Sequence, residues 1–161
     1  MDFNQRLERA IERGQKRRSE EDRERAERAM TEEECKNLHS KARLELSDHI
    51  EKCLRKLVDY FPGFEFQSVV DADGWGARIS RDDLAPGGGR GLDRFYSRIE
   101  MVVRPYSSSH IVELVARGTI RNKEVLSRSH FHLLSQLDLE AFSDLIDQWV
   151  LEYAEKFSAR A

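Results

Sequence analysis

The chain has 161 residues, 35% of them charged, and a net charge of −3 at pH 7. This near balance argues against general binding to nucleic acid and against a polybasic membrane anchor. No apolar run approaches the ~18 residues that a transmembrane helix needs, and the N-terminal sequence MDFNQRLERAIERGQKRR lacks the apolar centre of a signal peptide. We therefore expect a cytoplasmic protein without a membrane partner, built as one domain with an appendage.

The first 30 residues are predicted to form an exposed, charged helical arm in front of a single domain at 31–161. Phe3, Leu7 and Ile11 recur at four-residue spacing and make a short apolar stripe. Residues 15–25 carry no such stripe. Nothing in that segment would hold the arm against a core, so the stripe is a candidate binding surface for another chain.

A long amphipathic helix is predicted over residues 35–61. Thr31–Glu34 (TEEE) fits a capping box, with a hydroxyl N-cap and a glutamate three residues later. Cys35 and Cys53 lie 18 residues apart on the same face. At ~1.5 Å per residue they are ~27 Å apart, too far for a disulfide, so both are expected to be small buried hydrophobes.

Between this helix and a final amphipathic helix at 138–157, the apolar period changes from 3.6 to 2. Short turns separate the strand candidates, which favours antiparallel pairing. The predicted fold class is α+β, with an antiparallel meander of four to five strands and two long helices packed on one face. The five strand candidates are residues 64–70, 75–80, 94–104, 110–120 and 124–133.

Alternation along the strands predicts one apolar sheet face beneath the helices and one charged face in solvent. The side chains expected under the helices are Phe64, Phe66, Val70, Trp75, Ala77, Ile79, Phe95, Ile99, Met101, Val103, Val112, Leu114, Ala116, Val125 and Phe131. Those expected on the solvent face are Glu65, Gln67, Arg78, Arg98, Glu100, Glu113, Arg117, Arg128, His130 and His132.

Two glycine-containing loops resemble ligand sites only in part. The loop LAPGGGRGLDRF (84–95) has no Lys-Ser or Lys-Thr and precedes a strand rather than a helix, so it is predicted to connect strands rather than to bind phosphate. An anion contact through Arg90 and Arg94 is the alternative. The sequence DADG (71–74) lacks the later ligands of a calcium loop and is predicted to be a hairpin turn.

His130 and His132 are the candidate metal ligands of the sequence, because residues i and i+2 of a strand share a face. Zinc would need a third ligand, for which Glu113 or Glu65 are the acidic candidates on the predicted face. Two half-exposed histidines without a metal are the favoured interpretation, and no cofactor is expected.

Arg78, Arg98, Arg117 and Arg128 fall on successive strands of the predicted solvent face. Such a row could bind RNA or another polyanion. Glutamates interleave with the arginines, however, and cross-strand ion pairs would neutralise them. Binding to nucleic acid is therefore an alternative that the sequence does not favour.

No nucleophile elbow or other catalytic motif is recognisable, which favours a role other than catalysis. The leading hypothesis is a protein-interaction or assembly module that self-associates, or binds a protein partner, through Phe3, Leu7 and Ile11. A third hypothesis is a small-molecule pocket between sheet and helices, lined by Trp75 and Trp149.

Overall fold

The computed structural model describes residues 2–28, 30–86 and 91–160. Within them the chain forms three α-helices, five strands and one short 3-10 helix. In chain order these are α1 (Phe3–Arg28), α2 (Glu32–Tyr60), β1 (Glu65–Asp71), β2 (Gly74–Pro86), β3 (Leu92–Val103), β4 (Ile111–Ile120), β5 (Lys123–Leu133), η1 (Leu134–Gln136) and α3 (Leu139–Arg160).

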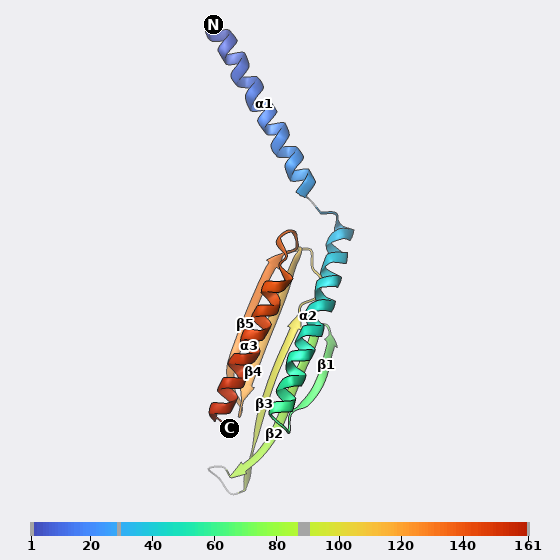
Figure 1. The fold of residues 1–161 in the computed structure, drawn as a ribbon, viewed down its shortest axis with the longest axis vertical. Coiled ribbons are helices and arrows are strands. Elements are labelled where there is room, and N and C mark those ends of the chain that lie inside the picture. Colours follow the sequence, from blue (N-terminus) through green and yellow to red (C-terminus); the bar gives the residue numbers. More distant parts are fainter. Residues whose placement is uncertain (1, 29, 87–90, 161) are drawn as a thin grey trace.

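The five strands form one antiparallel sheet in the order β1-β2-β3-β4-β5, so each strand pairs with its neighbour in the chain. α2 packs mainly on β1, β2 and β3, and α3 lies beside it over β4 and β5 (Figure 1). The predicted α+β architecture, with a meander sheet and two long helices on one face, is confirmed. α1 projects past the end of the sheet, away from both layers (Figure 1).

Local signals explain where α2 begins and ends. The Thr31 hydroxyl accepts a hydrogen bond of 3.1 Å from the Glu34 N–H, as the capping motif predicts. At the other end the Phe61 N–H donates to the Leu57 carbonyl before proline and glycine stop the helix. Between these two ends, the buried face of α2 packs on the sheet.

The core lies between the two helices and the central strands, where the predicted alternation holds. Ala77, Ile79, Ile99 and Met101 are all fully buried beneath the helices. The pairs between β2 and β3 continue the apolar row on this face, as Ile79 opposite Ile99 shows. Burial of these side chains is the main stabilising contribution to the domain.

The prediction for β5 is wrong by one residue from Leu126 onward, whereas Val125, predicted to be inside, is partly buried against the core. His130 lies opposite Leu114 and Arg128 opposite Ala116, so both lie on the helix side of the sheet, and His132 follows the same alternation. Phe131, predicted to be inside, is 54% exposed on the other face. A register irregularity between Gly118 and Thr119 of β4 lies next to this pairing. A shift of one residue exchanges the two faces of a strand.

Val70 is a second correction, because its side chain is 68% exposed. It pairs with Trp75, as its place in the alternation requires. β1 is an edge strand, however, and Val70 lies just before the β1–β2 turn, where solvent reaches it. Val69, on the other face, is 4% exposed instead.

The two glycine-containing loops adopt the predicted connecting roles as far as the structure describes them. Asp71 pairs with Gly74 across a tight turn, and the Asp73 N–H donates to the Asp71 carboxylate at 2.8 Å, as in a hairpin. β2 and β3 extend further than predicted, to a pair between Pro86 and Leu92. Arg90 lies outside the described residues, and Arg94 forms an ion pair with Asp82 at 3.5 Å.

Candidate functional site

The apolar stripe of α1 is open to solvent in the single chain. Phe3, Leu7 and Ile11 are 73%, 46% and 51% exposed. None of the three belongs to the hydrophobic core. The stripe therefore leaves three large apolar side chains in water, on a helix that extends away from the domain (Figure 1).

A groove of about 590 Å³ runs between α2 and α3. Its lining is largely apolar and includes two strongly exposed side chains, Tyr60 at 80% and Leu151 at 67%. The complete lining is Cys53, Lys56, Leu57, Tyr60, Phe61, Asp147, Val150, Leu151, Ala154 and Ser158. An apolar groove between two helices is a common binding site for another helix with an apolar face.

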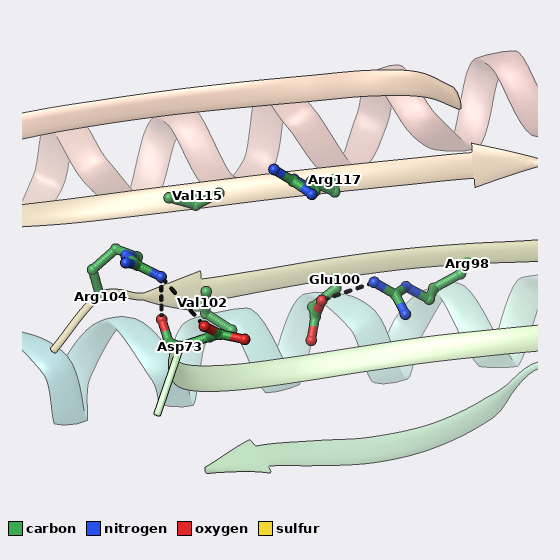
Figure 2. Close-up of a pocket in the computed structure, with 7 residues that line it drawn as sticks. All are labelled: Asp73, Arg98, Glu100, Val102, Arg104, Val115 and Arg117. Atoms are coloured by element: carbon green, nitrogen blue, oxygen red, sulfur yellow. Dashed lines mark hydrogen bonds and ion pairs between the residues drawn. The ribbon is translucent and has the colours of Figure 1, made fainter. Parts of the chain in front are cut away.

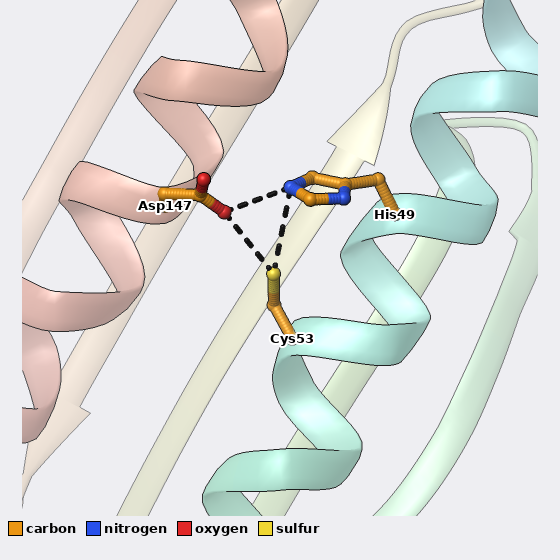
Figure 3. A group of neighbouring side chains, drawn as sticks. All are labelled: His49, Cys53 and Asp147. Atoms are coloured by element: carbon orange, nitrogen blue, oxygen red, sulfur yellow. Dashed lines mark hydrogen bonds and ion pairs between the residues drawn. The ribbon is translucent and has the colours of Figure 1, made fainter.

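Three side chains that could each offer a ligand atom to a metal ion meet at one end of this groove. His49 and Cys53 come from successive turns of α2, and Asp147 comes from the facing side of α3 (Figure 3). His49 Nε2 is 2.8 Å from Asp147 Oδ1 and 3.6 Å from Cys53 Sγ. Cys53 Sγ is 3.4 Å from the same Asp147 oxygen, so the three donor atoms form a small triangle.

This triangle differs from a catalytic triad of the cysteine-hydrolase type. In such a triad the acid binds one imidazole nitrogen and the nucleophile faces the other. Here both Asp147 and Cys53 face Nε2 of His49. Burial, the hydrogen bond to Asp147 and the charge of Asp147 raise the pKa of Cys53 to about 11. The free thiol is therefore protonated at neutral pH and is a poor nucleophile.

The sequence contains part of the signal for this cluster. His49 and Cys53 are four residues apart and share a helix face, but both also fit the apolar face of that helix. The structure leaves Cys53 only partly buried, whereas Cys35 is 3% exposed, and both thiols are free. Asp147 joins them only because α3 packs beside α2, which residue spacing does not reveal.

The solvent face of the sheet carries three of the four predicted arginines, Arg78, Arg98 and Arg117. Figure 2 shows two of them, Arg98 and Arg117. Glu100 lies among them and pairs with Arg78 at 3.7 Å and with Arg98 at 3.1 Å. Arg128 lies on the opposite side of the sheet. The face has a hollow of about 270 Å³, lined by Asp73, Arg98, Glu100, Val102, Arg104, Val115 and Arg117. Two carboxylates of this lining, Asp73 and Glu100, offset much of the positive charge of its three arginines.

His130 and His132 do face each other, with their Nε2 atoms 3.1 Å apart. Their rings pack against Phe142, and Nδ1 of His132 accepts a hydrogen bond from the Asp138 N–H at 3.3 Å. Glu113, predicted as a third ligand, lies opposite Phe131 on the other face. Glu65, the other candidate, is on β1 at the far edge of the sheet.

Within the described ranges, the only group of three or more possible metal-binding side chains is His49, Cys53 and Asp147.

The two tryptophans predicted to line a ligand pocket lie in different environments. Trp149 is 7% exposed and belongs to the core. Trp75 lines a hollow of about 470 Å³ beside the start of α2, and the Arg43 guanidinium lies 3.0 Å from the centre of its ring. Trp149 is not part of that lining.

No helix in the described ranges is long and apolar enough to cross a membrane. Comparison of the chain with protein-family models, with curated proteins and with solved structures found no match.

Proposed function

We propose that the protein is a self-associating assembly module in which α1 of one copy docks into the α2–α3 groove of a second copy. The observation that carries this proposal is the presence, in one chain, of an exposed apolar stripe on a projecting helix and an exposed apolar groove between two other helices. Docking of the stripe in the groove would remove both apolar surfaces from water, and burial of apolar surface stabilises association.

The spacing of the two surfaces along the chain supports reciprocal docking. Phe3 and Leu57 each lie 27 residues from Met30, Leu7 and Cys53 each lie 23 residues from it, and helices rise equally per residue. Two copies arranged antiparallel about a twofold axis near Met30 would therefore set the stripe of each against the groove of the other. A closed twofold dimer is the commonest form of self-association.

Charge supports the same pairing. The first 16 residues of α1 (3–18) contain six basic and two acidic residues. α3, which forms one wall of the groove, contains five acidic and two basic residues. Opposite net charges on the two helices favour encounter between copies. The groove lining itself carries one base, Lys56, and one acid, Asp147.

The closest competing arrangement is α1 folding back onto its own groove, since the same spacing would permit it. That arrangement gives a monomer, whereas exchange between copies gives a dimer. Binding of α1 to a different protein would also leave the isolated chain monomeric. The mass in solution thus separates the proposal from both.

The test is sedimentation equilibrium of the full chain and two matched variants. Leu151→Asp introduces a charge into the groove lining, at a side chain that is 67% exposed. Leu44→Asp makes the same change at a side chain that is 60% exposed and lies nine residues before Cys53, about half a turn around α2 from the groove at ~100° per residue. Neither change removes a core side chain.

We expect a dimer for the wild type and for Leu44→Asp, and a monomer for Leu151→Asp at the same concentration. A monomeric wild type, or equal masses for the two variants, would contradict the proposal.

A further inference from the structure

We propose that His49, Cys53 and Asp147 form a zinc-binding site at the end of the α2–α3 groove, with the fourth position open to water (Figure 3). The inference does not depend on self-association, because all three ligands belong to one chain and are brought together by the packing of α2 against α3. It assigns a chemical role to three side chains, of which Cys53 and Asp147 also line the groove.

The separations of the donor atoms suit a tetrahedral ion. Bonds of ~2.3 Å to sulfur and ~2.0–2.1 Å to nitrogen and oxygen place sulfur ~3.5 Å from either lighter atom, and nitrogen ~3.3 Å from oxygen. The structure has 3.6 Å and 3.4 Å for the two sulfur separations. The nitrogen–oxygen separation is 2.8 Å, the length of a direct hydrogen bond. Binding therefore needs His49 and Asp147 to part by about 0.5 Å.

The donor set matches zinc chemistry. Zinc accepts thiolate, imidazole and carboxylate ligands, whereas calcium and magnesium prefer oxygen alone. Three protein ligands plus an exchangeable fourth position are typical of open zinc sites. The His49 and Asp147 side chains are 32% and 50% exposed, so an ion can enter from solvent.

Binding replaces the S–H bond of Cys53 by a Zn–S bond, and the released proton passes to the buffer. An ordinary cysteine thiol has a pKa of about 8.5, so most of it carries this proton at neutral pH before the metal arrives. Zinc binding to this site therefore releases about one proton per ion from the thiol.

The histidine pair on β5 serves as an internal comparison. His130 and His132 provide two nitrogen donors, and the Nδ1 of His132 is already occupied by the Asp138 N–H. Their carboxylate candidate Glu113 lies on the other side of the sheet. Replacing this pair should leave the proposed zinc site intact.

The experiment titrates the full chain with Co²⁺ and then displaces it with Zn²⁺. Cobalt bound to a thiolate gives a near-ultraviolet charge-transfer band, and tetrahedral cobalt gives strong visible bands. We expect one Co²⁺ per chain with both signals, displacement by one Zn²⁺, and release of about one proton in weakly buffered solution.

Variants assign the ligands. Cys53→Ser should abolish the charge-transfer band, while Cys35→Ala and the His130→Ala/His132→Ala double variant should retain it. Even the outer partners of metal ligands are worth about 10–100-fold in affinity, so His49→Ala and Asp147→Asn should each weaken zinc binding at least about tenfold.

Circular dichroism of each variant checks that the domain has folded. Absence of the band in the folded wild type, or its persistence in Cys53→Ser, would overturn the assignment. Equal zinc affinity in the wild type and Asp147→Asn would also overturn it.

Discussion

The hydroxyl of Tyr153 on α3 donates a hydrogen bond of 2.8 Å to the backbone carbonyl of Thr119 on β4. Tyr153 is fully buried, and burial raises the pKa of its hydroxyl above the usual range, so it stays protonated as a donor. Thr119 is also the residue at which the pairing of β4 with β5 changes register. This hydrogen bond thus joins α3 to the sheet at the point where the pairing of β4 with β5 is irregular.

The close approach of Tyr153 to Gly118 predicts that Gly118→Ala destabilises the domain. A methyl group there would lie 2.9 Å from the Tyr153 ring and 3.0 Å from Leu126 Cβ. Glycine to alanine in an unstrained, open position is stabilising by about 0.4–1 kcal/mol, whereas overpacking costs about 1–3 kcal/mol. We expect a net loss, measured by urea denaturation of the full chain.

Gly14→Ala is the control for that measurement, because nothing lies within 4 Å of the methyl group it would add on α1. It should leave the unfolding of the domain unchanged or raise helix stability slightly. Equal or greater stability of Gly118→Ala would show that the ring moves away without cost, contrary to our account.

The ion pairs of Glu152 with Lys156 and Arg128 should contribute to the stability of the fold in a pH-dependent way. The hydrogen bond from Lys156, then the charges of Lys156 and Arg128, lower the pKa of Glu152. A carboxylate with a lowered folded-state pKa stabilises above its unfolded value of about 4.3, and this contribution is lost as pH falls through the folded value. Glu152→Gln should therefore cost up to about 1 kcal/mol at neutral pH, with the difference disappearing in acid.

Denaturation of the wild type and Glu152→Gln, at neutral pH and at a pH below both pKa values, checks this sign. Glu155→Gln is the matched control on the same helix, since Glu155 forms no ion pair with the described residues. A difference between wild type and Glu152→Gln that grows in acid would contradict the expected linkage.

Glu100 neutralises part of the positive charge that Arg78, Arg98 and Arg117 give to the solvent face of the sheet. It pairs with both Arg78 and Arg98, and Arg117 lies directly opposite it on β4 (Figure 2). Glu100→Gln should raise the salt concentration needed to elute the chain from immobilised heparin, because the freed arginines can contact sulfate groups. Glu155→Gln changes the net charge equally on α3, and elution of both variants at the same salt concentration would contradict the local effect.

Sequence patterns predicted the elements whose neighbours in space are also neighbours in the chain. The helix period defined α2, and strict alternation placed Ile79, Ile99 and Leu114 under the helices. Local chemistry also predicted the Thr31 cap and the Asp71–Gly74 turn. In each case the signal lies within a few residues of the feature.

The features that the sequence did not reveal depend on packing between distant segments. In β5 both Val125 and Leu126 are apolar, so alternation there fits either register, and the irregularity at Gly118 and Thr119 decides between them. The faces of Arg128 and His130 follow from that choice. Likewise, Asp147 is 98 residues from His49, and only the packing of α3 on α2 brings them together.

The most direct test of α1 exchange between copies is a thiol crosslink between two different chains. The double variant Leu7→Cys/Cys53→Ser gains a thiol at position 7 and loses the one at position 53. When it is mixed with wild type, a link between positions 7 and 53 must therefore join two chains.

Because Leu7 and Cys53 lie equally far from Met30, we expect a covalent dimer with a short thiol crosslinker, and mass spectrometry should map the link to positions 7 and 53. The reaction is run at alkaline pH, because the pKa of the Cys53 thiol is raised to about 11 and the thiolate is the reactive form. Gln5→Cys/Cys53→Ser is the control, since position 5 lies about half a turn away on α1 at ~100° per residue, and it should give little product. No 7–53 link, or equal yields from the two mixtures, would contradict the account.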